Sequence, residues 1–175
     1  METHDIIPMS RASILQYTQL IRSKLGISKT EPYVDIVRVL EYFLPKYFTD
    51  LHTEILSVDE MGEHHGLTYP NRNLILLRED VYDGACQGRG RDRFTIAHEI
   101  GHLLLHEGVD PRYARRDPLK PRPAYLDPEW QSNAFAGYFL MSPQAIHGKT
   151  PLEVANACGV SHEAATVQLK ILAKK

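Results

Sequence analysis

Two histidines and a glutamate stand close together near the middle of the chain, as His98, Glu99 and His102. In a helix, residues four apart lie on one face, one turn from each other, so both imidazoles can reach one Zn²⁺ ion. Glu99 projects beside them and is placed to take a proton from a water on the metal. Zinc lowers the pKa of that water from ~15.7 to about 7, which makes hydroxide available at neutral pH. This spacing therefore predicts zinc-assisted hydrolysis with Glu99 as the general base.

The residues around this motif favour a buried helix. An H-E-x-x-H pattern also occurs by chance on solvated helices, where Lys or Glu would stand among its neighbours. Here the positions next to the motif on its C-terminal side carry no charge, and Ala97 before it is small. The apolar residues that surround the motif are Phe94, Ile96, Ala97, Ile100, Leu103 and Leu104. This apolar surface is what a buried active-site helix requires, so we favour a zinc site over a chance match.

A catalytic zinc ion usually takes three protein ligands and leaves a fourth position for water. His106 continues the four-residue series, but it lies about 12 Å from His98 along a helix axis. That is too far for one ion with Zn–N bonds of about 2.1 Å, and we interpret His106 as a helix-end residue favoured by the dipole. The longer motif H-E-x-x-H-x-x-G-x-x-H also fails, because the chain has Leu105 and Gly108 where Gly and His are needed.

A carboxylate from a following helix is the remaining candidate for the third ligand. Asp127 and Pro128 are typical of a helix start, and we expect that helix to run to about residue 141. Glu129 lies near its start, and Asn133 follows one turn later on the same face. This suits a ligand at 129 and an oxygen acceptor at 133 that orients a bound histidine. The alternative is that Glu129 merely complements the helix dipole.

With these residues the chain resembles the ImmA/IrrE family of metallopeptidases. The matching segments are residues 93–106, 129–136, 139–143 and 154–161, followed by Ala164, Ala165 and Leu169. Together these segments cover roughly residues 30–172. The combination is far more specific than the zinc motif alone.

The resemblance implies both a metal site and a biological role. The zinc ligands that it implies are His98, His102 and Glu129, with Glu99 as the general base. It also implies a regulatory protease that cleaves a DNA-binding repressor encoded nearby, often on a prophage or an integrative element. The chain departs from the family in two places: Ser132 stands where members often have Ala, and the Pro- and Arg-rich stretch 111–125 matches no family motif.

Composition limits the class of protein. The 175 residues suffice for one domain with a real core, and 43% hydrophobic residues with 24% charged ones are ordinary for a globular chain. The net charge of −2 argues against a strong nonspecific attraction to DNA or anionic membranes. Two isolated cysteines, Cys86 and Cys158, indicate a reducing compartment rather than a disulfide framework. With no apolar run near the ~20 residues of a membrane span and no secretory signal, we expect a cytoplasmic protein.

A small sheet is expected before the zinc helix. Apolar spacing predicts two helices first, over residues 10–25, ending at Gly26, and over residues 32–44. The period then changes to that of short strands, at residues 54–58, 66–69 and 73–77, with a turn over 69–73.

In zinc peptidases of this general plan, an edge strand of such a sheet holds the extended substrate backbone. By analogy, the candidate substrate-binding residues are Leu74, Ile75 and Leu76. The alternative is that this strand is simply core.

Two Gly- or Pro-rich segments flank the zinc helix. Residues 84–93 are expected to form a Gly/Arg-rich loop that leads into it. Residues 107–127 combine prolines with basic residues and link the two helices that carry the candidate ligands. Such a loop is often just solvated. Because of its place beside the cleft, Arg115 and Arg116 are nevertheless candidates for contact with a substrate or partner.

The C-terminal segment, residues 151–175, predicts a helix, a turn at 159–161, and a second helix capped by Ser161. This pattern is typical of a helix-turn-helix. A DNA-reading version would expose Arg, Lys, Asn or Gln near the start of its second helix. The residues offered there are His162, Glu163, Thr166 and Gln168. We therefore expect a unit that packs on the catalytic domain, and no direct DNA binding.

These observations predict an α+β fold, with a small β-sheet packed on zinc-binding helices and a helical C-terminal subdomain. The expected parts are a loose N-terminal tail at residues 1–9, a metallopeptidase domain at 10–148 and the subdomain at 149–175. The expected function is that of a zinc-dependent regulatory metallopeptidase of gluzincin type that cleaves one cytoplasmic protein, a helix-turn-helix repressor. The alternatives are a regulatory binding protein that keeps the zinc fold, and a toxin–antitoxin component, each acting without efficient proteolysis.

Overall fold

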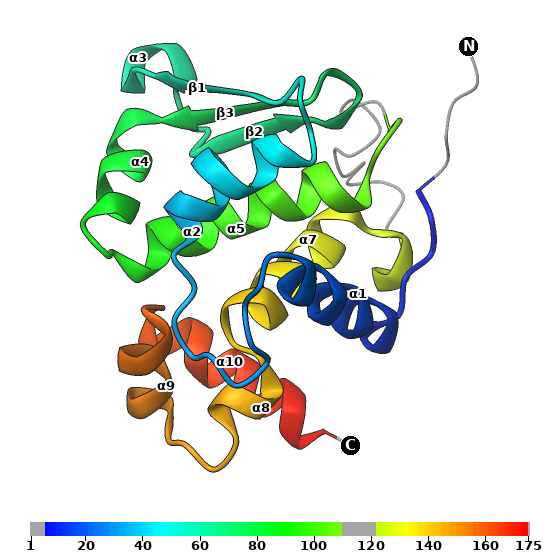
Figure 1. The fold of residues 1–175 in the computed structure, drawn as a ribbon, viewed down its shortest axis with the longest axis vertical. Helices are drawn as coiled ribbons and strands as arrows, with labels where there is room; N and C mark the ends of the chain where they lie inside the picture. Colours follow the sequence, from blue (N-terminus) through cyan, green and yellow to red (C-terminus); the bar gives the residue numbers. More distant parts are fainter. Residues whose placement is uncertain (1–5, 110–121, 175) are drawn as a thin grey trace.

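A computed structural model of the chain describes residues 6–109 and 122–174. It has an α+β fold, with a small sheet at one end and helices α1 and α7–α10 gathered at the other (Figure 1). The helices are α1 (Arg11–Lys24), α2 (Ile36–Arg38), α3 (Val58–Met61), α4 (Glu79–Cys86), α5 (Gly90–Leu105), α7 (Pro128–Leu140), α8 (Pro143–Ile146), α9 (Pro151–Cys158) and α10 (His162–Ala173). The strands are β1 (His52–Leu56), β2 (Gly66–Tyr69) and β3 (Leu74–Arg78). Shorter turns of 3-10 or π-helix are Val39–Phe43, Leu44–Lys46, Pro70–Arg72 and Ala124–Leu126.

The three strands pair in the order β1-β3-β2, with β1 parallel and β2 antiparallel to β3. A short turn joins β2 to β3, and Asn73 closes it in a left-handed conformation at φ 47°, which Asn tolerates better than most residues. Because β3 is hydrogen-bonded on both sides, the prediction that Leu74–Leu76 form a substrate-binding edge was wrong. Ile75 and Leu77 are fully buried, so β3 belongs to the core. The edge strand that packs on α5 is β2.

Most predicted helix ends are confirmed by their caps. Ser10 accepts from the Ser13 amide before α1, Asp127 from the Glu129 amide before α7, and Ser161 from the Ala164 amide before α10. A side-chain oxygen at each N-cap thus satisfies an amide that has no partner within its own helix.

Two segments differ from the prediction. The helix expected over residues 32–44 begins only at Ile36, because the Asp35 side chain caps the Arg38 amide. The loop expected over residues 84–93 is mostly helical, and Gly84 lies inside α4. A Cβ at Gly84 would lie 1.9 Å from an Asp92 carboxylate oxygen, so this glycine marks a close crossing of α4 and α5.

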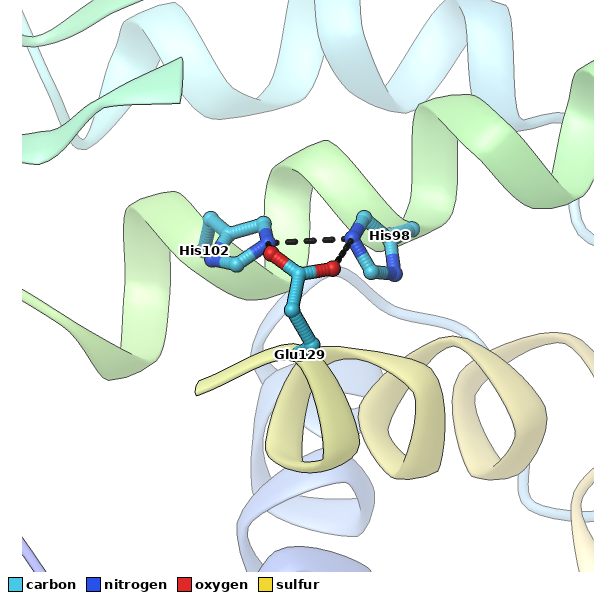
Figure 2. A group of neighbouring side chains, drawn as sticks. All are labelled: His98, His102 and Glu129. Atoms are coloured by element: carbon cyan, nitrogen blue, oxygen red, sulfur yellow. Dashed lines mark hydrogen bonds and ion pairs between the residues drawn. The ribbon is translucent and has the colours of Figure 1, made fainter. Parts of the chain in front are cut away.

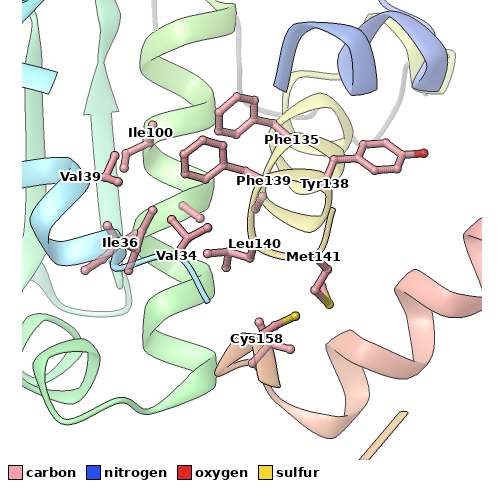
Figure 3. Close-up of a cluster of buried hydrophobic side chains, with 14 of the residues drawn as sticks. Val34, Ile36, Val39, Ile100, Phe135, Tyr138, Phe139, Leu140, Met141 and Cys158 are labelled. Atoms are coloured by element: carbon pink, nitrogen blue, oxygen red, sulfur yellow. The ribbon is translucent and has the colours of Figure 1, made fainter. Parts of the chain in front are cut away.

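Helix α5 lies between the sheet and α7: one of its faces packs on the sheet and another packs on α7 (Figure 1). The contact with α7 is tight, because a Cβ at Gly101 would lie 3.2 Å from the Ser132 Cα. Figure 3 shows the core on this side, where side chains from α2, α5, α7 and α9 meet. The fully buried members include Ile36, Ile100, Phe135, Phe139, Leu140 and Cys158. The same packing that forms the core therefore sets the distance between α5 and α7.

The C-terminal helices share this core. Val154, Cys158 and Ala165 belong to the hydrophobic cluster that α5 and α7 form. Buried Arg93 of α5 donates to the carbonyl oxygens of Gly159 (2.8 Å) and Cys158 (3.3 Å) at the end of α9. The core is thus continuous between the predicted domain and the predicted subdomain.

Part of the predicted N-terminal tail is held in place. The Met9 amide donates to the Tyr125 carbonyl, and the Ile7 carbonyl accepts from the Gln131 side chain. The expectation of a loose tail is therefore wrong for this part of it. In the described ranges, every helix is too short or too polar to cross a membrane.

Candidate metal centre

Helix α5 presents two imidazoles on one face. His98 and His102 are one turn apart, and their Nε2 atoms lie 3.0 Å from each other. The side chains are 16% and 12% exposed, so they are largely covered by protein. Both rings therefore point their Nε2 atoms at one common position.

Helix α7 brings a carboxylate to the same position (Figure 2). Asp127 caps the helix and Pro128 follows it, which places Glu129 in the first turn. Its Oε1 lies 3.2 Å from Nε2 of His102, and its Oε2 lies 3.3 Å from Nε2 of His98. Hydrogen bonds from His102 and His98 hold the pKa of Glu129 well below its usual range, against the opposing effect of burial. The carboxylate is therefore ionised at neutral pH.

These three side chains fit a tetrahedral metal ion. One ligand atom from each of His98, His102 and Glu129 can be chosen so that all lie within 4.8 Å of one another. With bonds of 2.0–2.2 Å, neighbouring ligands of a tetrahedral zinc ion are about 3.3–3.6 Å apart, only slightly more than the separations of 3.0–3.3 Å seen here. Two imidazoles with one carboxylate are also a donor set that catalytic zinc uses. The cluster can therefore hold a divalent cation of zinc's size and leave one position for water.

Asn133 orients the first histidine. Nδ1 of His98 lies 3.0 Å from Oδ1 of Asn133, one turn after Glu129 on α7. If Nδ1 carries the proton and donates it to this oxygen, Nε2 keeps its lone pair for a metal. Burial lowers the pKa of His98, but the hydrogen bond to Glu129 and the charges of Glu99 and Glu129 together raise it above its ordinary value.

The second histidine is oriented by a chain of two further side chains. Nδ1 of His102 lies 3.1 Å from Nδ1 of His106, and Nε2 of His106 lies 2.9 Å from Oε1 of Gln131. One set of tautomers satisfies both of these contacts: Nδ1 of His102 donates to His106, and Nε2 of His106 donates to Gln131. Burial, then the proximity of His102, lowers the pKa of His106 to about 4. His106 ends α5 as its C-cap, as we expected, but it is buried and neutral, so the expected stabilisation by the helix dipole was wrong.

Glu99 lies on the other side of α5, against β2. It is 6% exposed, and its Oε2 accepts a hydrogen bond of 2.6 Å from the Thr68 hydroxyl. A Cβ at Gly66 would lie 2.7 Å from Cγ of Glu99, so only glycine leaves room for this side chain beside the strand. Glu99, Gly66 and His98 line one cavity of about 290 Å³. The candidate base thus faces the same space as one of the candidate ligands.

Not every predicted site residue lies here. Leu74, Ile75 and Leu76 form the central strand, whose paired backbone cannot accept a further strand. Arg115 and Arg116 lie outside the described residues.

The sequence did not predict Gly66, Thr68 or Gln131 as residues of the site. The first two contact a residue more than thirty positions away, so no local pattern marks them. Gln131 had one weak signal, because it lies two residues after the candidate ligand Glu129.

The arrangement is metallopeptidase-like: a sheet, a helix with two histidines flanking a glutamate, and an acid from the next long helix. The chain belongs to the peptidase M78 family, whose profile, described as the IrrE N-terminal-like domain, matches residues 50–170. Membership of this family supports a metallopeptidase-like, regulatory function. No curated protein matches the chain significantly.

Proposed function

We propose that this protein is a zinc-dependent endopeptidase. The observation that carries the proposal is the convergence of two Nε2 atoms and one carboxylate from His98, His102 and Glu129, at separations that suit tetrahedral zinc. When bound, the ion supplies Lewis acidity, which makes a water molecule acidic enough to ionise near neutral pH. Asn133 and the pair His106–Gln131 keep each histidine in the tautomer that binds a metal.

The proton steps fall to Glu99. Its carboxylate lines the cavity beside His98, where it can accept a proton from water and later donate it to the leaving amine. Thr68 fixes one carboxylate oxygen by its hydrogen bond, and the neighbouring Gly66 leaves room for the rest of the side chain. An acid–base group that is held in this way loses little orientation between the two proton transfers.

Strand β2 takes the role that we first assigned to β3. Among the described residues it pairs only with β3, so its second edge is available for an extended substrate. Gly66, at its start, lines the cavity with Glu99, which places this edge next to the candidate base. A substrate backbone added there would run beside the general base.

The substrate that we propose is a helix-turn-helix repressor encoded beside this gene. The support is the resemblance to the ImmA/IrrE family and the need for narrow recognition in a protease of the cytoplasm. Arg115 and Arg116 are proposed to steer an acidic segment of that partner. Reversing both to Glu is expected to slow cleavage, with a smaller effect at high salt because ions screen exposed charges.

The test separates ligands from base. Purified protein is expected to carry about one zinc per chain, as a three-ligand catalytic site predicts. His98→Ala and Glu129→Gln are expected to lose zinc, whereas Glu99→Gln keeps it and loses cleavage of the neighbouring repressor. Glu54→Gln, an exposed carboxylate on β1, is the matched control and keeps both. Full zinc in His98→Ala would end the metal assignment.

The outcome for Glu99→Gln also decides between two classes of function. If this variant cleaves the repressor as fast as the unaltered protein, Glu99 is not the base. If neither protein cleaves but both bind the repressor, a zinc-fold regulatory binding protein replaces the peptidase.

A further inference from the structure

A second cavity, of about 460 Å³, lies between α5, α7 and α10. We call it the α10 groove and define it by Phe94, Trp130, Met141, Val167, Gln168 and Ile171. Its walls are mainly apolar, and Val167 of α10, one of the lining residues, is 51% exposed. Apolar surface that a monomer leaves open in a concave place marks a binding site more often than a convex patch does.

This groove is continuous with the candidate metal centre. Phe94, Thr95 and Asn133 line both the α10 groove and the cavity that holds Glu99. Asn133 is the residue that contacts Nδ1 of His98. A substrate chain that passes the candidate ligands can therefore continue into this apolar channel, on the side away from β2.

A buried amide in the wall of the groove has no partner. Gln168 is 4% exposed, and its Nε2 makes no hydrogen bond to any described residue. Its Oε1 lies 2.7 Å from the place of a Cβ on Gly137, so the amide fits over α7 only because that position is glycine. Leaving a buried donor unpaired is costly. An extended peptide offers an acceptor at every residue, and a turn of the Gln168 side chain toward the groove would bring its amide to one of them.

We propose that the α10 groove binds the substrate chain on one side of the scissile bond. The occupant is an extended segment with apolar side chains, and one of its carbonyl oxygens accepts a hydrogen bond from Gln168. This inference rests on the proposed peptidase function. A peptide suits the site better than nucleic acid, because the walls are mainly apolar and Glu163 offsets part of the charge of Arg11 and Arg91 among the lining residues. The C-terminal helices, which resemble a DNA-binding unit, would thus complete a peptide site.

Binding can be measured without catalysis, because the chain has a single tryptophan and it lies in the groove. The protein is the zinc-loaded Glu99→Gln variant, and the probe is an acetylated and amidated octapeptide of alternating Leu and Ser. A peptide of alternating Asn and Ser is the polar control. We expect a saturable change in Trp130 emission with the leucine peptide and none with the asparagine peptide. An equal response to both, or no response, overturns the proposal.

Two substitutions on α10 test the walls of the groove. Val167→Asp places a charge in the apolar channel and is expected to weaken binding of the leucine peptide by at least about tenfold. Val58→Asp, at a valine of similar exposure on α3, is the matched control and leaves binding unchanged. Gln168→Met keeps the size of the side chain but removes the donor, so we expect binding to weaken by about 2–10-fold. Unchanged binding in Val167→Asp refutes the assignment.

Two further outcomes separate this inference from its rivals. If Trp130 emission changes with protein concentration in the absence of peptide, a second copy of the chain occupies the groove and the proposal fails. Cleavage of the neighbouring repressor gives the other arm, in a background with intact Glu99. Val167→Asp is expected to raise KM and leave kcat nearly unchanged. If Val167→Asp cleaves with an unaltered KM, the groove does not bind the substrate. If the unaltered protein binds the leucine peptide but shows no cleavage, only the peptidase function is refuted.

Discussion

His106 tests how the metal site is organised, because we predict that it does not bind the metal and yet controls the affinity for zinc. It is 3% exposed and stands between His102 and Gln131, with contacts of 3.1 Å and 2.9 Å. His106→Leu keeps an apolar group of similar size but removes both contacts. Nδ1 of His102 then has no acceptor, and its ring is free to turn or to change tautomer.

The expected loss follows from the chemistry of such partners. Removing a group that orients a metal-bound histidine typically costs 10–100-fold in affinity, or about 1.4–2.7 kcal/mol. Water cannot easily replace His106, because the site is buried, so we expect the upper part of that range. Asn133→Leu is expected to have a smaller effect on His98, because Asn133 is exposed and water can take its place.

Zinc affinity is measured by competition with a chromogenic chelator of known affinity. His106→Gln is the conservative variant, since its amide can accept from His102 and donate to Gln131, and it is expected to recover most of the affinity. His147→Leu, an exposed histidine elsewhere, is the control. Thermal unfolding of the metal-free proteins shows whether the fold itself is damaged. If His106→Leu binds zinc as tightly as the unaltered protein, the orienting role of His106 is refuted.

Three more substitutions probe other contacts. Gly66→Ala puts a Cβ 2.7 Å from Cγ of Glu99, so it is expected to abolish peptide cleavage while zinc content, measured by metal analysis, stays at one per chain. Arg22→Met removes a buried guanidinium that donates to three backbone carbonyl oxygens, which is expected to lower the free energy of unfolding in urea by at least about 3 kcal/mol. Ser132→Ala removes a buried hydroxyl that has no partner among the described residues, and is expected to raise the free energy of unfolding by about 1–2 kcal/mol. A lower stability of Ser132→Ala would show that this hydroxyl is satisfied in solution.

The sequence predicts the helices of the site well because their signals are local. An N-cap at Asp127 and a proline after it determine where α7 starts, and the start determines which face carries Glu129. The spacing of His98 and His102 is also a local signal, because it alone places both side chains on one face of α5. Each of these inferences needs only the geometry of a single helix.

The parts that the sequence did not predict depend on contacts between distant segments. The hairpin of β2 and β3 is readable, but the position of β1 beside β3 follows from a connection through α3 that no short pattern specifies. The role of His106 is another case, because it depends on Gln131 from a different helix. A glycine such as Gly84 suggests a loop in the sequence, whereas its real function is to let two helices cross.

The metal site itself is a consequence of helix packing. Two candidate ligands come from α5 and one from α7, so the distance between these helices decides whether three atoms can share one ion. That distance is set where Gly101 of α5 meets Ser132 of α7, one turn from Glu129 and within one turn of both histidines. The buried side chain of Phe135 holds the same contact closed from the core side. Because the ligand geometry and the core share this one contact, a change that loosens the core is expected to weaken metal binding as well, even where it touches no ligand.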